Sequence, residues 1–152
     1  MAKRVLTSPR LAKPTMPYSS ATQAGNMIFV AGMVSQDAKA QIVGLGDVAA
    51  QTRQVLENVK AAVEAGGGTM RDVTKTTVYI TDLSAFPAMN QVFGQYFPVD
   101  PPARATVRCE LMRPEFLVEI DAIAVVGSGP AAGAKRRPAA KRAAKRPARK
   151  RK

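Results

Sequence analysis

Residues 116–126, FLVEIDAIAVV, form a predicted β-strand that is apolar on both of its faces. Large apolar side chains alternate along it, with Phe116, Val118 and Ile120 on one face and Leu117, Ile123 and Val125 on the other. Because an apolar sheet face must be shielded from water, a sheet that contains this strand needs a cover on both sides.

The other apolar patterns predict two helices, which are too few to provide both covers. The apolar positions of residues 47–65 fall on one helical face, with Asp47 as N-cap and Gly66–Gly68 as the stop. A second helix is predicted over residues 84–96, where Pro87 is tolerated because it falls in the first turn. If both helices cover one face, a second copy of the chain is the simplest cover for the other. We therefore expect a homo-oligomer.

Strands complete an α+β chain of the order β-β-α-β-α-β-β. Runs rich in β-branched and apolar residues predict the strands. Besides 116–126, these runs are 26–34, 41–44, 75–81 and 104–111. Residues 1–17 contain Pro and Lys and are predicted to be an N-terminal arm, residues 18–126 the folded domain, and residues 127–152 a tail.

The tail carries almost all of the net charge of +12. Residues 135–152 hold 11 Lys and Arg and no Asp or Glu, so the other 12 basic residues face all 11 acidic ones. The predicted domain is therefore close to neutral, and the charge of the whole chain is not a property of its folded surface. Because Ala, Pro, Lys and Arg leave nothing to bury, we expect the tail to be disordered when free.

Missing residue types exclude several classes of chemistry. The chain has no histidine, which excludes Ser-His-Asp and Cys-His catalytic sites and most zinc sites, and we expect no metal. Cys109 is the single cysteine, so no intrachain disulfide can form. No apolar run is long enough for a transmembrane helix, and no apolar stretch follows the N-terminal charges as in a secretory signal. We therefore expect a cytoplasmic protein without a membrane partner.

Arg104 begins the predicted strand 104–111 directly after the rigid sequence Pro101-Pro102-Ala103. A guanidinium held at such a position, beside an oligomer interface, could clamp a substrate carboxylate in bidentate fashion. A structural salt bridge is the alternative, and by spacing alone it is the commoner role of an arginine on a strand.

Glu119 lies in the middle of an apolar strand, where a carboxylate needs a partner or a function. It could hold and activate a water molecule, or it could pair with an arginine. By spacing alone the paired structural role is favoured. Asp121 shares its face and is the competing candidate.

Three further residues have both a functional and a structural interpretation. Tyr18 ends the arm and could line a pocket or only anchor the arm. Asn90 lies between apolar neighbours of the second helix, where a surface role is as consistent as a site. Cys109 shares a strand face with Ala105 and Val107, which favours an inert core thiol over a nucleophile.

Six segments in sequence order resemble the Rid family, the YjgF-like reactive-intermediate deaminases. They are Pro17-Tyr18-Ser19, AGNMIFVAG, QTRQVLENVKAAVEAGG, VTKTTVYITDLSAFPAMNQVFGQYF, PPARATV and LVEIDAIA. The resemblance extends over residues 4–126 without large gaps. Its most specific part is the pairing of PPAR with VEI.

The resemblance implies a chorismate-mutase-like α+β fold and a homotrimer, with the sheets in a central barrel, the helices outside and the sites between subunits. It also implies a hydrolase of the 2-iminobutanoate/2-iminopropanoate deaminase type, which converts 2-imino and 2-enamino acids to 2-keto acids and ammonia without a cofactor. Some members of the family are described as ribonucleases or translation inhibitors. The absence of histidine makes a ribonuclease the weaker alternative here.

By position, Arg104 matches the carboxylate-binding arginine of the family and Glu119 the glutamate near the attacking water. Tyr18, Asn90 and the backbone at Ala31-Gly32 match residues that line the pocket. These matches reverse the preference for structural roles that spacing alone gives.

Three departures from the family pattern border the expected cleft and bear on substrate range. Met16 replaces the usual Gly before Pro-Tyr, Ser20 replaces the usual Gln after the Ser, and the turn at 112–116 reads MRPEF.

The tail resembles the C-terminal arms of histone H1-like proteins. It supports a second hypothesis, a nucleoid-associated trimer that binds DNA or RNA without sequence preference, in which three tails act together. A solvated tail that only aids solubility is the alternative. The basic residues that would contact phosphates are Lys135, Arg136, Arg137, Lys141, Arg142, Lys145, Arg146 and Arg149.

Overall fold

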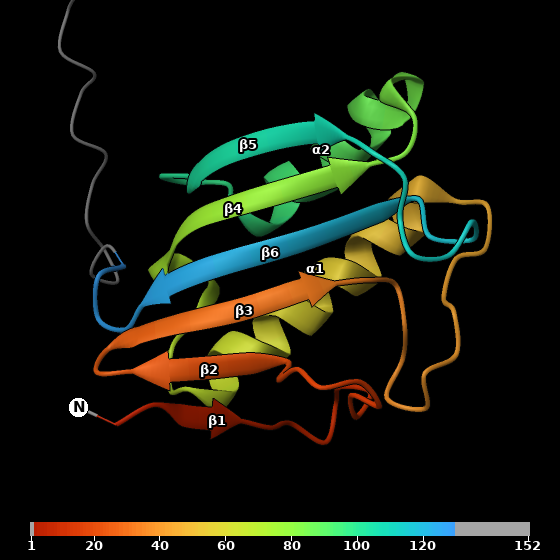
Figure 1. Cartoon of the computed structure of the whole chain (residues 1–152). Helices are drawn as coiled ribbons and strands as arrows, with labels where there is room; N and C mark the ends of the chain where they lie inside the picture. Colours follow the sequence, from red (N-terminus) through yellow and green to blue (C-terminus); the bar gives the residue numbers. More distant parts are fainter. Residues whose placement is uncertain (1, 130–152) are drawn as a thin grey trace, which may run out of the picture.

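A computed structural model describes residues 2–129 of the chain as one sheet with helices packed on one of its faces (Figure 1). The strands are β1 (Arg4–Leu6), β2 (Ala21–Ala24), β3 (Met27–Met33), β4 (Val73–Ile80), β5 (Ala103–Arg108) and β6 (Val118–Val125). The helices are α1 (Val48–Ala65) and α2 (Phe86–Tyr96), and short 3-10 turns at Met70–Asp72 and Leu83–Ala85 precede β4 and α2. The predicted α+β class is confirmed.

The six strands are arranged in the order β1-β2-β3-β6-β4-β5. All neighbours are antiparallel except β4 and β5, which are parallel because α2 lies between them in the chain. The last strand in sequence therefore lies inside the sheet, between β3 and β4, while β1 and β5 form the two edges.

The first part of the chain differs from its prediction. β1 lies within the predicted arm, and β2 is an additional strand that pairs β1 with β3. The predicted strand at 41–44 is wrong, because only one isolated bridge, from Gln36 to Ile42, occurs there. Gly44 takes a left-handed φ of 73°, which ends any extended run. The side chain of Asn58 on α1 instead holds this loop through the backbone oxygens of Val34 and Gln36, at 3.0 and 2.9 Å.

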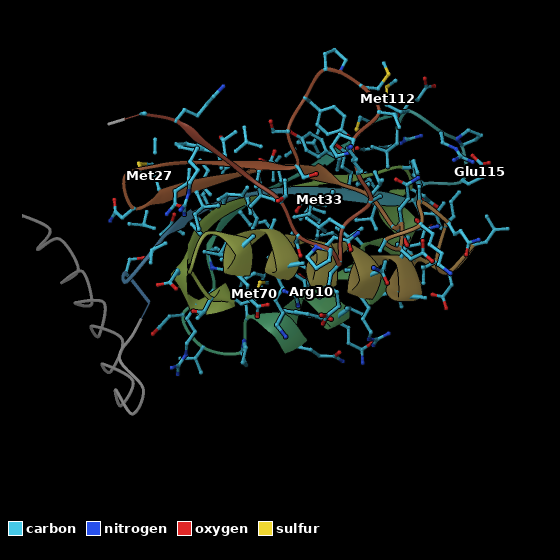
Figure 2. All side chains as sticks on the ribbon, turned by 90° about the horizontal axis from the view of Figure 1, so that it is seen from below. Arg10, Met27, Met33, Met70, Met112 and Glu115 are labelled. Carbon is cyan, nitrogen blue, oxygen red and sulfur yellow. The ribbon has the colours of Figure 1, made fainter. Side chains whose placement is uncertain are left out.

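The two faces of the sheet have different surroundings. On β6 the residues that face the helices are fully buried, namely Val118, Ile120, Ala122 and Ala124. Figure 2 shows both helices on one side of the sheet and none on the other. On that helix-free face Met27, Phe29 and Val107 are 38, 40 and 45% exposed. The described part of one chain therefore covers only one of the two apolar faces predicted for the last strand.

Polar side chains at the start of α1 determine where β6 begins. Asp47 caps the helix as predicted, with its carboxylate accepting from the backbone N–H groups of Ala49 and Ala50 at 2.9 and 3.0 Å. One turn later the buried Gln51 accepts from the N–H of Leu117 at 2.9 Å and donates to the oxygen of Glu115 at 2.8 Å. Satisfied amides of this kind fix backbone position in a core. They hold the chain two residues before Glu119.

Asp72 fastens the end of the domain. Its buried carboxylate accepts from the N–H and hydroxyl of Thr69 at 2.8 and 2.9 Å and from the N–H groups of Gly127 and Gly129 at 2.9 and 3.0 Å. Hydrogen bonds to the domain thus continue to Gly129, past the predicted start of the tail at 127. The eight predicted phosphate-binding residues between 135 and 149 lie outside the described residues.

Replacing Asp72 with Asn is expected to lower the free energy of unfolding by about 1–3 kcal/mol at neutral pH, since buried donors lose their acceptor. Burial alone would raise the pKa of Asp72, but the hydrogen bonds from Gly129, Thr69 and Gly127 lower this pKa overall. A carboxyl whose pKa is lowered by folding stabilises the protein above its unfolded-state pKa, and this contribution is lost as the pH falls through the folded-state pKa.

Urea denaturation of wild type and Asp72→Asn should therefore show a difference that shrinks below about pH 4. Glu110→Gln, at an exposed position, is the control and should leave the midpoint unchanged. Equal midpoints for Asp72→Asn and wild type at pH 7 would show that the hydrogen bonds accepted by Asp72 do not stabilise the fold.

Candidate functional site

A β-bulge interrupts β3 where it pairs with β6. Val30 pairs with Ala122 and Met33 with Ile120, so Ala31 and Gly32 both lie opposite Asp121. Bulges redirect side chains and often lie beside functional sites. The N–H of Ala31 donates to the oxygen of Ser20 at 3.0 Å, which brings the end of the N-terminal segment against the bulge.

Glu119 lies over the backbone of Gly32. A Cβ atom added to Gly32 would be 1.9 Å from Oε1 of Glu119, so the carboxylate occupies the space that any side chain at position 32 would need. Burial raises the pKa of Glu119, and the nearby charge of Asp121 raises this pKa further. No side chain or backbone group among residues 2–129 forms a hydrogen bond with this carboxylate. It is thus a basic acceptor available to water.

Asp121, the competing carboxylate on the same face, is engaged by its neighbours. Its two oxygens accept from the backbone N–H of Thr77 at 3.1 Å and from the hydroxyl of Tyr79 at 3.0 Å. The hydrogen bond to Asp121 also raises the pKa of Tyr79. The geometry therefore gives Asp121 a structural role in joining β4 to β6 and leaves Glu119 as the carboxylate without a partner in the described chain.

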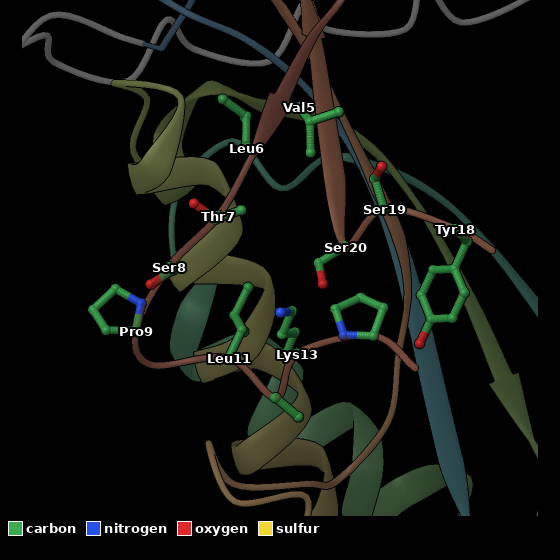
Figure 3. A pocket seen from close by; sticks show the side chains of 12 residues that line it. Val5, Leu6, Thr7, Ser8, Pro9, Leu11, Lys13, Tyr18, Ser19 and Ser20 are labelled. Atoms are coloured by element: carbon green, nitrogen blue, oxygen red, sulfur yellow. The ribbon is translucent and has the colours of Figure 1, made fainter. Parts of the chain in front are cut away.

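Tyr18 reaches the same region from the segment between β1 and β2. A cavity of about 150 Å³ is lined by Tyr18 and Gly32, together with Ser20 and Asn58. A second hollow, of about 540 Å³, lies inside the loop that carries Tyr18 (Figure 3). Tyr18 and Gly32 therefore line one cavity and Glu119 lies over Gly32, while the side chain of Met16 is exposed.

Arg104 and Asn90 form a second group, on β5 and α2. The Nη2 group of Arg104 donates to the side-chain oxygen of Asn90 at 2.8 Å. The guanidinium carbon lies 4.6 Å from the ring centre of Phe93 and 5.7 Å from that of Phe86. Stacking and this hydrogen bond hold the guanidinium in place, and no partner for Nη1 or Nε occurs in the described part of the chain.

The two groups lie on opposite faces of the sheet. In the parallel register Arg104 pairs with Thr76, whose side chain is buried on the helix side, and the side chain of Arg104 contacts α2. Glu119 pairs with Tyr79 on the helix-free face. Within one chain the sheet separates Arg104 from Glu119, so both can contact one small molecule only if a second copy of the chain contributes one of them.

Cys109 is half-buried, which corrects its predicted place in the core. β5 is an edge strand, and the face that Cys109 shares with Val107 has no cover in the described chain. Its N–H donates to the oxygen of Ile80 at 3.1 Å, and it borders a surface cavity of about 770 Å³ with Arg108 and Arg113. The neighbouring turn at 112–116 is held by the Arg113–Glu115 ion pair at 3.0 Å.

Two negative findings concern the described residues. Over residues 2–129 no three side chains of the His, Cys, Asp or Glu type are grouped closely enough to hold a metal ion. In the same range no helix combines the length and the apolarity needed to cross a membrane.

Comparisons with known proteins agree with the fold. Residues 8–126 match the endoribonuclease L-PSP family. A RutC family protein of Pyrococcus horikoshii is 44% identical over 122 residues, which span 80% of this chain and 97% of that protein. The crystal structure of RidA from an Antarctic Psychrobacter species has a TM-score of 0.76 and 32% identity, covering 81% of this chain and 99% of that one.

A third relative has a ligand in its crystal. The structure of Escherichia coli TdcF with bound serine has a TM-score of 0.75 and 34% identity, covering 80% of this chain and 98% of that one. These similarities run over nearly the full length of the relatives, with the same sheet and helices. The predicted resemblance is thus confirmed at the level of the family, and the chain belongs to the endoribonuclease L-PSP family together with the YjgF, RutC and RidA proteins.

Proposed function

We propose that the protein hydrolyses 2-imino and 2-enamino acids to 2-keto acids and ammonia, at sites that two copies of the chain complete. The observation that carries the proposal is the separation of Arg104 and Glu119 onto opposite faces of one sheet. It leaves each chain with a carboxylate-binding group on one face and a water-binding group on the other. The occurrence of a RidA protein among the relatives, and of TdcF with an amino acid bound, supports a small amino-acid-like substrate.

Arg104 binds the carboxylate of the substrate. One hydrogen of Nη2 is held by Asn90 and one face of the guanidinium lies over Phe93, so the second Nη2 hydrogen and the adjacent N–H of Nη1 or Nε remain to donate to two carboxylate oxygens. Because the side chain is ordered before the substrate arrives, little rotamer entropy is lost on binding. The carboxylate then fixes the position of C2, which is bonded to it.

Glu119 of another copy activates the water. The C2 atom of a protonated imine is electrophilic, and its attack needs only a water oriented towards it and relieved of a proton. Glu119 accepts that proton, the water oxygen bonds to C2, and the C=N double bond becomes single. Glu119 returns this proton to nitrogen, the C–N bond breaks, and the departing ammonia takes the hydroxyl proton, which leaves ammonium and the 2-keto acid. The raised pKa of Glu119 strengthens it as a base, and orientation of both reactants can lower the barrier by about 7–11 kcal/mol in the best cases.

The helix-free face supplies the reason for assembly. Its exposed Met27, Phe29 and Val107 lie on the same face as Glu119, Asp121 and Tyr79, so a second copy packed there would bury apolar surface on the side of the sheet that carries Glu119. A homotrimer is the assembly that the family resemblance implies. In it, Tyr18, Ala31 and Gly32 line the Glu119 side of each cleft, and Asn90 lines the Arg104 side.

A ribonuclease activity is not part of the proposal, although the family is named after one. Enzymes of that kind commonly use histidine for acid–base catalysis, and this chain has none. A second function is favoured by residues 135–152, whose 11 basic residues and lack of acidic ones suit non-specific binding of DNA or RNA. Since the catalytic groups lie in the folded domain, the two functions are compatible.

Exchange of subunits between two inactive variants tests the shared site. Arg104→Ala and Glu119→Gln should each lower kcat/KM for 2-iminobutanoate by at least about tenfold, through loss of a charged hydrogen bond or of the base. Unfolding and refolding a 1:1 mixture should restore up to about a quarter of wild-type activity, because random trimers then contain interfaces with both native residues.

Ammonia release from imine generated in situ is the measurement, and Arg108→Ala is the matched control, an exposed arginine of the same strand. Full activity of either single variant would contradict the assigned roles. If both variants assemble and the mixture recovers no activity, Arg104 and Glu119 act in a site formed by one chain.

The pH dependence tests Glu119 separately. The wild-type rate should fall as the pH is lowered through the raised pKa of Glu119, and Glu119→Gln should lack this decrease. Because folding raises this pKa, the ionised carboxylate costs stability above it, so the Gln variant should melt no lower than wild type at pH 7. If the rate of Glu119→Gln still falls at low pH, the decrease in the wild-type rate is due to another titrating group.

Truncation after residue 129 tests the second function. The full chain should retard duplex DNA or RNA in a gel, and retardation should weaken steeply between 50 and 200 mM salt because binding releases counterions (a range of roughly 10³–10⁵ in affinity for six to ten phosphate contacts). The truncated chain should not bind but should keep its deaminase rate. Equal retardation by both forms would exclude the tail as the binding element.

A further inference from the structure

A cavity of about 370 Å³ adjoins the guanidinium of Arg104. Its polar groups are Arg104 and Asn90, which already bind each other, and the rest of its lining is Phe93, Gly94, Phe97 and the Pro101-Pro102 pair. A binding site for a small molecule typically combines such an apolar lining with a few polar groups that fix orientation. A molecule whose carboxylate is bound to Arg104 therefore has an apolar wall beside it.

That wall is rigid. The rings of Phe93 and Phe97 are both buried, with centroids 4.7 Å apart and planes tilted by 38°. Pro101 and Pro102 have restricted backbones, so the segment that enters β5 cannot easily collapse onto the rings. A preformed apolar surface of this kind favours an apolar substituent, while a charged one would lose hydration against it without a partner.

Gly94 is the one position of this lining without a side chain. It lies inside α2, where glycine is less stable than alanine, and its φ is not in the left-handed region. A Cβ atom placed there would meet no atom within 4 Å. Neither backbone conformation nor packing within the described chain therefore requires glycine at position 94. Position 94 is exposed and borders the cavity, so a long side chain there has room to extend across its mouth.

We propose that this cavity receives the side chain of the 2-imino acid and that Gly94 keeps it open, so that the enzyme favours imines with branched or aromatic apolar side chains. The inference rests on the proposed function, since it takes Arg104 as the carboxylate ligand. Gly94 determines specificity and takes no part in the chemistry. It acts only on substrates large enough to reach the cavity from Arg104.

Substitution at position 94 tests this role. Imines generated in situ from alanine, leucine and phenylalanine are compared for wild type and Gly94→Leu. Wild type is expected to have at least fivefold higher kcat/KM for the two larger imines. Gly94→Leu is expected to lower kcat/KM for these at least tenfold and to change that of the alanine-derived imine less than twofold.

Gln91→Leu is the matched control, an exposed position of the same helix that does not line the cavity. It should leave the selectivity as in wild type. Gly94→Leu should also melt no lower than wild type, because leucine is the better helix former. Equal losses for all three imines, or no loss for any, would overturn the cavity assignment while leaving the deaminase function in place.

A binding measurement separates this inference from the proposed function. Pyruvate, 4-methyl-2-oxopentanoate and phenylpyruvate carry the carboxylate and side chains of the three imines and need no turnover to bind. In calorimetric titrations the two larger keto acids should bind wild type at least fivefold more tightly than pyruvate, and Gly94→Leu should abolish the difference. If no imine is hydrolysed, the deaminase proposal fails, and these titrations alone decide the role of the cavity; equal affinities in wild type overturn it.

Discussion

The packing of one face of β6 against the helices determines the face of the sheet on which Glu119 lies. Val118, Ile120, Ala122 and Ala124 are buried beneath α1 and α2, and because side chains alternate along a strand, Glu119 must then face the other way. A shift of β6 by one residue would bury the carboxylate among apolar groups and expose the core. The hydrophobic core therefore specifies the register that makes Glu119 accessible.

Regular periodicity made much of the fold predictable. The sequence predicts the helix at 47–65, its Asp47 cap and the last strand with two apolar faces. Each of these patterns is long and is bounded by capping or turn residues. β1 and β2 are too short for such a pattern, with three and four residues, and owe their structure to pairing at an edge. The apolar pair Ile42-Val43 resembles a strand but belongs to a loop in which the backbone N–H and oxygen of Val43 are hydrogen-bonded to Ser35.

The site was less predictable from the residues alone. Spacing placed Glu119 and Asp121 on the same face and could not separate them, because the difference lies in hydrogen bonds from β4, a strand distant in sequence. The pairing of Arg104 with Asn90 depends on how α2 lies over β5, which no local pattern contains. The family resemblance named Arg104 and Glu119, and the register of the sheet places their side chains on opposite faces.

The hydrogen bonds of Asp72 have a consequence for where the basic C-terminal segment leaves the folded domain. They fasten residues 127–129 beyond the C-terminal end of β6, whereas Glu119 lies near the N-terminal end of that strand. At the usual rise per residue the two ends are roughly 20 Å apart. The last described residue before the basic segment therefore lies at the far end of the strand that bears Glu119, about the length of that strand away from the carboxylate.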